Sequence, residues 1–208
     1  HILALLASVA IGALFILAGF TVKSEKSRKA LRLAFVAVLI VVRGSRYVMD
    51  ACVGRFDIYD LFSLQICHID LILLIICLIK PNRALFHFNF LLGIPMGLSV
   101  ALMPGSVHPE PGMPRAILFI MSHMLLVMGA LYLSVVERMT LKLRYLLFIL
   151  GAGNAAIVVI YFVNKALGTN FLYIMSAPSG TVIEKLYGLF GWPGYVAVMD
   201  AIAVIVVT

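Results

Sequence analysis

Cys67 and a few acid–base side chains lie within apolar stretches of the sequence. They could carry out chemistry only if the fold brings them together. Cys67 and His68 are adjacent, Asp70 follows one helical turn after Cys67, and His123 lies in a separate apolar stretch. A thiol attacks a carbonyl group as the thiolate, which needs a base within hydrogen-bond reach. We therefore predict Cys67 as a nucleophile and His123 or His68 as its base, with Asp70 or Asp200 orienting the imidazole.

Each of these residues also has a structural interpretation. A buried cysteine commonly packs as a small hydrophobic residue, and a histidine inside a membrane commonly joins helices by hydrogen bonds. On the helical rise of about 1.5 Å per residue, Cys67, His123 and Asp200 each lie about 10–12 Å from one end of their helices. The common depth favours a shared polar site, and the sequence leaves both interpretations open.

A second group of polar residues is suited to binding a substrate. Arg46 and Asp50 are four residues apart, so they face each other on a helix and are predicted to form an ion pair. That pair either fixes the helix or lets Arg46 orient a phosphate. Gln65 and Asn164 could donate hydrogen bonds to an oxyanion, and Asp200 completes the predicted site.

The composition places these residues in a membrane. Of 208 residues, 63% are hydrophobic and only 12% are charged, and the mean hydropathy is +1.12. A soluble domain has roughly a quarter charged residues. The net charge of +7 comes from loops between apolar stretches, which is typical of topology signals, so nucleic-acid binding is not expected.

A span needs about 20 apolar residues, which predicts an all-α, polytopic transmembrane helix bundle with about seven spans in a single domain over 1–208. The segment Gly168–Trp192 is too apolar for a solvated loop and too interrupted for a span, so we expect it at the membrane interface or as a lid. The chain begins and ends in apolar sequence, so we expect a longer protein. The predicted spans are about 2–22, 31–53, 60–80, 84–103, 115–137, 145–166 and 193–208.

The loop cations predict the orientation, because cytoplasmic loops carry an excess of Lys and Arg. Ten cations fall in one set of alternate loops and four in the other. The N-terminus is therefore expected outside and the C-terminus inside. The richer set is Lys23, Lys26, Arg28, Lys29, Arg32, Lys80, Arg83, Arg138, Lys142 and Arg144, and the poorer set is Arg55, Arg115, Lys165 and Lys185.

Cys52, Cys67 and Cys77 have no metal-ligand spacing and are too few and too scattered for a disulfide framework. We expect no metal and no other cofactor. The expected partners are membrane lipids, and the sequence does not determine the oligomeric state.

Three sets of short segments form recognisable motifs, and they are Phe62–Cys67, Met121–Met124 with Gly129–Leu133, and Gly168–Met175 with Gly191–Pro193. In these segments the chain resembles the bacterial YwaF-type integral membrane family. That family is similar to eukaryotic multi-pass acyltransferases that remodel ether phospholipids through a cysteine acyl-enzyme.

The resemblance implies a membrane lipid acyltransferase or transacylase in the bacterial plasma membrane. By motif position it implies Cys67 as nucleophile and His123 as the histidine. The family often has a histidine two residues before the cysteine, where this chain has Gln65, and His68 follows the cysteine instead. A site in the outer half of the membrane favours a phospholipid as acyl donor. Two alternatives stay open, a transporter or channel for a small polar or anionic solute and a non-catalytic membrane partner protein.

Overall fold

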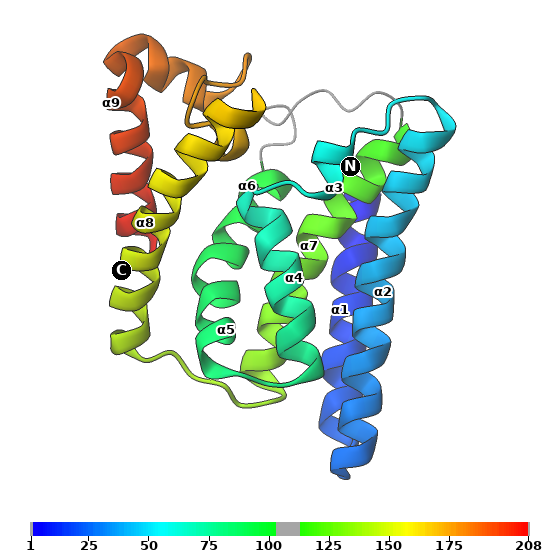
Figure 1. Cartoon of the computed structure of the whole chain (residues 1–208). Helices are drawn as coiled ribbons and strands as arrows, with labels where there is room; N and C mark the ends of the chain where they lie inside the picture. Colours follow the sequence, from blue (N-terminus) through cyan, green and yellow to red (C-terminus); the bar gives the residue numbers. More distant parts are fainter. Residues whose placement is uncertain (1, 103–112, 208) are drawn as a thin grey trace.

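The computed structural model describes residues 2–102 and 113–207, and these residues form helices without strands. The predicted all-helical membrane bundle is confirmed (Figure 1). The elements are α1 (Ile2–Thr21), α2 (Glu25–Cys52), α3 (Ile58–Leu61), α4 (Ile66–Ile79), α5 (Arg83–Phe88), the π-helix η1 (Asn89–Gly93), α6 (Ile94–Leu102), α7 (Met113–Val135), α8 (Leu143–Leu167), the 3-10 turn η3 (Phe171–Tyr173) and α9 (Val182–Val207).

Four of the described helical stretches are long and apolar enough to cross a membrane. They are Ile2–Thr21, Arg83–Val100, Pro114–Val135 and Arg144–Leu167. Of the other predicted spans, α2 has 28 residues but carries charges along its length, α4 has only 14 residues, and α9 is interrupted by a kink.

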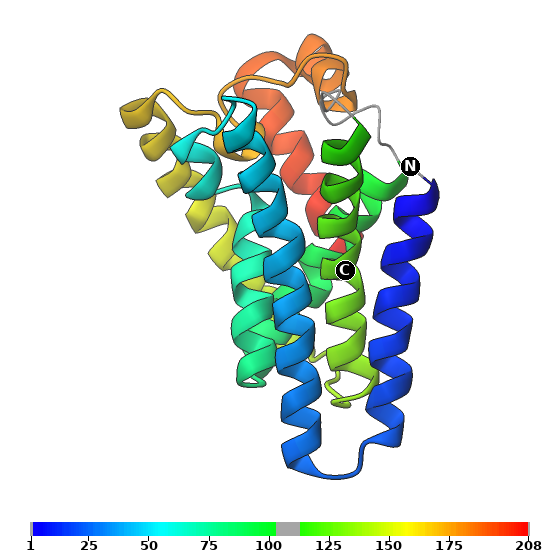
Figure 2. The same ribbon diagram turned by 90° about the vertical axis from the view of Figure 1, so that its right-hand side faces the viewer.

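Helix α7 is the centre of the bundle and packs against α1, α2, α4 and α6. Its contact with α1 is close because α1 presents Gly12 and Gly19 to it. A Cβ atom at Gly12 would lie 2.4 Å from the Cβ of Met128. Helices α8 and α9 lie together to one side and α1 and α2 lie on the other (Figure 1). In the turned view of Figure 2, α1 and α2 therefore lie in front.

The segment expected as one helix over 60–80 is divided in two. Asp57 accepts a hydrogen bond from Tyr59 N at 2.9 Å and begins the short helix α3, and Ser63 Oγ accepts one from Gln65 N at 3.3 Å. Such local side-chain bonds compete with the helical pattern. Helix α4 therefore begins at Ile66, and Cys67 is its second residue.

The last helix begins earlier than the expected residue 193. Glu184 N donates to Thr181 Oγ1 at 3.3 Å, and Gly180 N donates to the Glu184 carboxylate at 2.7 Å, an arrangement close to a capping box. The helix is interrupted at Gly191, whose φ is +61°, so the residues before it are set apart from the rest of α9.

The connections α1–α2, α4–α5 and α7–α8 lie at the lower end of the bundle in Figure 1, and α2–α4 and α8–α9 lie at the upper end. The cation-rich loops are thus gathered at one end. That this end is cytoplasmic stays a prediction. The predicted outer loop 104–114 and its His108 lie largely or wholly outside the described residues.

Candidate functional site

Helices α2, α4 and α7 enclose a small cavity to which the structure brings both Cys67 and His123. Its volume is ≈ 10 Å³, which is about the space needed for one water molecule. The lining residues are Arg43 from α2, Cys67 and Leu71 from α4, and Ser122, His123 and Leu126 from α7. The structure thus brings Cys67 and His123 together, although Cys67 lies in the first turn of α4 and not about 10–12 Å along a helix that begins near residue 60.

Cys67 also contacts the neighbouring imidazole. Its Sγ lies 3.5 Å from His68 Nδ1, and His68 Nε2 contacts the guanidinium of Arg43. Arginine has donors and no acceptor, so His68 Nε2 must accept that hydrogen bond. The proton of a neutral His68 is then on Nδ1 and points to the sulfur. With this tautomer, His68 Nδ1 can donate a hydrogen bond to the Cys67 sulfur and has no lone pair there to take the thiol proton.

His123 has the opposite arrangement. Its Nδ1 lies 2.8 Å from the carbonyl oxygen of Phe119, which can only accept, so Nδ1 carries the proton and donates it. The lone pair of a neutral His123 is therefore on Nε2. Ser122 Oγ also donates to the Phe119 carbonyl, at 2.8 Å. Of the two predicted bases, the hydrogen bonds favour His123.

The position of Cys67 in α4 adds a further electrostatic contribution. Gln65 is the N-cap residue of α4, and its side chain makes no capping hydrogen bond. The first N–H groups of a helix carry partial positive charge, which stabilises a thiolate beside them. Burial opposes a charged sulfur, so the helix terminus and Arg43 together must offset the cost of desolvation.

Asp70 does not orient either imidazole. Asn89 Nδ2 donates to the Asp70 carboxylate at 2.6 Å and to its backbone carbonyl at 3.0 Å. The predicted role of Asp70 beside the base is therefore replaced by a contact between α4 and η1. The carbonyl of Phe119 holds His123 instead.

The predicted pair of Arg46 and Asp50 is present but is not the closest ion pair. Arg46 Nε lies 3.9 Å from Asp50, whereas Arg115 Nε from α7 lies 2.7 Å from it and Arg115 Nη2 lies 3.3 Å away. The Arg46 guanidinium also lies 5.1 Å from the ring centre of Phe119. The sequence could not show the Arg115 contact, because that residue is 65 positions from Asp50.

Gln65 and Asn164, expected to bind an oxyanion, hold one backbone segment in place. Gln65 Oε1 accepts from Leu172 N at 3.0 Å. Asn164 Oδ1 accepts from Phe171 N at 2.8 Å and from Thr169 Oγ1 at 2.9 Å, and its Nδ2 donates to Phe171 O at 3.0 Å. These bonds use the amide oxygens of both residues and one N–H of Asn164, so their structural role is to hold this segment, and their predicted role as oxyanion donors stays a prediction.

The segment Phe171–Ile174, which we call the strap, joins α4, α8 and α9 beside the N-terminus of α4. Tyr195 Oη donates to Tyr173 O at 2.6 Å, and Trp192 Nε1 donates to Ile174 O at 3.1 Å. Leu172 and Tyr173 have φ values of +59° and +53°, a left-handed conformation that costs energy without glycine. Burial, and next the nearby Cys67, raises the pKa of Tyr173.

The comparison with known proteins decides the family. The model of the TMEM164 family matches residues 1–208. The chain belongs to the TMEM164 family. Searches of curated proteins and of solved structures found no match. The TMEM164 family match identifies an integral membrane protein, whereas neither the YwaF assignment nor a bacterial plasma membrane follows from it.

Asp200 of this TMEM164-family protein is not brought to the cavity. It lies on α9, where Asn154 Nδ2 of α8 donates to its carboxylate at 3.4 Å. Helices α8 and α9 lie together away from α7 (Figure 1). The shared depth of Asp200 and Cys67 therefore does not bring them together.

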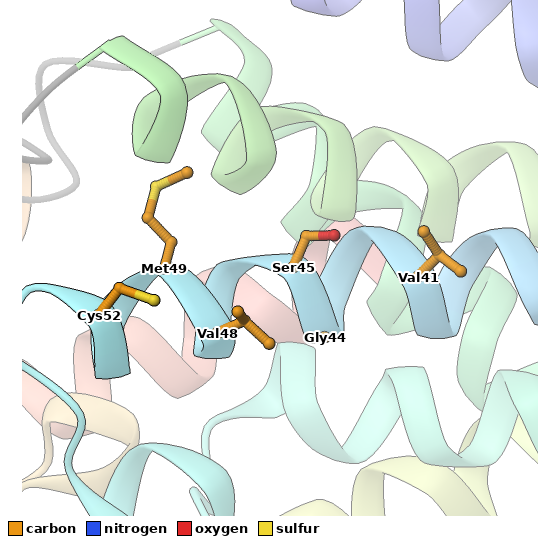
Figure 3. Close-up of a pocket in the computed structure, with 6 residues that line it drawn as sticks. All are labelled: Val41, Gly44, Ser45, Val48, Met49 and Cys52. Carbon is orange, nitrogen blue, oxygen red and sulfur yellow. The ribbon is translucent and has the colours of Figure 1, made fainter.

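A wider hollow of ≈ 580 Å³ lies along α2, and Figure 3 shows its lining side chains. All of them come from this one helix, so the hollow is an open helix surface and not an enclosed site. None of the predicted site residues lines it. The lining residues are Val41, Gly44, Ser45, Val48, Met49 and Cys52.

Proposed function

We propose that this TMEM164-family protein is a membrane-embedded lipid acyltransferase or transacylase that works through a cysteine acyl-enzyme. The single observation that carries the proposal is the arrangement around Cys67. The thiol lies at the start of α4, His68 Nδ1 lies 3.5 Å from it, and His123 lines the same cavity with its Nδ1 bonded to the Phe119 carbonyl, which leaves Nε2 as its basic nitrogen. Nucleophilic catalysis by a cysteine requires a thiol, a base that removes its proton and a hydrogen-bond donor that stabilises the thiolate.

The proposed first step forms a thioester. His123 Nε2 takes the thiol proton as the sulfur of Cys67 attacks the ester carbonyl carbon, and the carbon–sulfur bond forms. The ester carbon–oxygen bond then breaks, and the leaving alkoxide takes the proton from His123. In the second step His123 removes the proton of an acceptor hydroxyl, whose oxygen attacks the thioester and releases the Cys67 thiolate, which the imidazolium protonates.

The proposed substrates are phospholipids. Splitting the transfer into two steps lets the acyl chain stay in the bilayer while head groups exchange. With the cation-rich end in the cytoplasm, the cavity lies toward the outer leaflet, and a phospholipid reaches it more readily than a cytosolic acyl carrier. We propose Arg46 as the phosphate-binding cation. The closed cavity has the size of one water, so the strap or the helices must move to admit an ester.

The proposal is tested with the protein in nanodiscs that contain an acyl-labelled phospholipid and an unlabelled lysophospholipid. The expected result is transfer of label to the lysophospholipid, with a hydroxylamine-sensitive label on the protein. Cys67→Ala is expected to abolish both, while Cys77→Ala keeps both. Full transfer by Cys67→Ala would overturn the enzyme. Solute flux without protein labelling would favour a transporter, and the absence of both activities would favour a partner protein.

A further inference from the structure

Two buried side chains outside the proposed chemistry face each other across the contact of α4 with η1. Asp70 is 0% exposed and Asn89 is 1% exposed. Asn89 Nδ2 donates to both the carboxylate and the backbone carbonyl of Asp70, so the amide hydrogens of Asn89 are used. The second carboxylate oxygen, Asp70 Oδ2, and the amide oxygen, Asn89 Oδ1, have no hydrogen-bond partner among the described residues.

Both of these oxygens are acceptors, so each lacks a hydrogen-bond donor or a cation. The charge decides between them, because a bare carboxylate in a membrane interior is strongly disfavoured unless a cation or a proton neutralises it. The nearby charged and titratable groups are bonded elsewhere. On the elements packed against α4 these groups are Arg43, which contacts His68; Arg46, which lies near Asp50; His87, which bonds to Arg83 O and Lys142 N; and His123, which bonds to Phe119 O.

We infer that Asp70 and Asn89 form a buried site for one monovalent cation, a proton or Na⁺, held between Asp70 Oδ2 and Asn89 Oδ1. A proton on Oδ2 would be donated to Oδ1, and a sodium ion would accept both oxygens as ligands. Either species satisfies both unpartnered atoms. Among the residues described, no three His, Cys, Asp or Glu side chains come together, which fits a monovalent cation and not a transition metal.

Gly93 in η1 keeps this site open. A Cβ atom at Gly93 would lie 2.3 Å from Asp70 Oδ2, so any side chain there would displace the carboxylate. Residues 89–93 form a π-helix, a rare form found mostly as a single turn within α-helices and frequently at functional sites. The glycine and the π-helix together explain how a carboxylate fits between two closely packed helices.

The site has a consequence for Cys67, which lies one turn before Asp70 on the same helix. A negative Asp70 would oppose a thiolate at Cys67, whereas a neutralised Asp70 does not. The bound cation also ties α4 to η1. This inference does not depend on the acyl-transfer proposal, because it rests on the two unpartnered oxygens alone.

The test is the melting temperature of the protein in nanodiscs, measured with NaCl replaced stepwise by choline chloride and, separately, across a series of pH values. We expect a shift of about 3–6 °C for each tenfold change in the concentration of the bound cation. Stabilisation by sodium identifies Na⁺, and a melting temperature that falls as pH rises, without a sodium effect, identifies the proton.

Asp70→Asn should remove the response, because its amide can donate to Asn89 Oδ1 without a cation. Asp57→Asn, an exposed residue that keeps its capping role, is the matched control and should respond as the wild type does. A wild-type protein insensitive to both sodium and pH would overturn the inference, as would an Asp70→Asn variant that responds like the wild type. If Asp70→Asn does not fold, the wild-type titrations decide alone.

Discussion

Replacing Gly97 by alanine tests how closely α6 packs against the helix that carries His123. A Cβ atom at Gly97 would lie 2.5 Å from Val127 Cγ2 and 2.7 Å from the backbone oxygen of His123. The side chain of Val127 can rotate, but the backbone oxygen cannot move without α7. Overpacking of this kind costs about 1–3 kcal/mol, and the better helix propensity of alanine returns about 1 kcal/mol. The expected net loss of stability is therefore up to about 2 kcal/mol.

The assay is thermal unfolding of both variants and the wild type in one detergent, with Gly151→Ala as the control. Gly151 is an exposed helical glycine, and a Cβ atom there would meet nothing within 4 Å. We expect Gly97→Ala to lower the melting temperature by up to about 8 °C and Gly151→Ala, which gains helix propensity without a clash, to leave it unchanged or raise it. Equal melting temperatures for the two variants would refute the packing of α6 on α7 described above.

Three further predictions follow from the contacts and the topology. Asp50→Ala should lower the melting temperature more than Asp57→Ala, because Asp50 is 2% exposed and pairs with two arginines, and equal values would remove this ion cluster from the account. In otherwise cysteine-free protein, a cysteine at His108 should be labelled from outside intact cells and one at Lys26 should not; the reverse result would invert the orientation. Gln65→Ala removes one of the bonds that hold the strap, so a bulky thiol reagent should then reach the site cysteine faster, and an unchanged rate would show that the strap does not limit access.

The helices and the gathering of cation-rich loops at one end could be predicted from the sequence, because both depend on local hydropathy and alternation. That Cys67 and His123 meet agrees with the sequence, but the depth given for Cys67 assumed one helix over 60–80, whereas α4 begins at Ile66. The break before α4 was missed. Its signals, Asp57 and Ser63, are weak and compete with a strongly apolar pattern on either side.

Contacts between distant segments were beyond the sequence. Depth alone placed Asp200 with Cys67, but depth says nothing of lateral position in a bundle, and α9 packs on α8 instead. Asn164 was predicted as an oxyanion donor, and the sequence could not show that its side chain bonds to the backbone of the strap. The choice between His68 and His123 required knowledge of which atom lies opposite each ring nitrogen.

The central claim, that Cys67 is a nucleophile and His123 its base, is tested most directly by labelling with a lipid-like thiol-reactive probe in membranes at neutral pH. Exposure alone would favour Cys52, which is exposed, so preferential labelling of Cys67 reports activation. We expect that preference in the wild type, a fall in rate of about 10²–10⁴-fold in His123→Ala and a smaller fall, about 10- to 100-fold, in His68→Ala. The claim would be contradicted if Cys67 is not labelled in the wild type, or if it is labelled at an unchanged rate in His123→Ala.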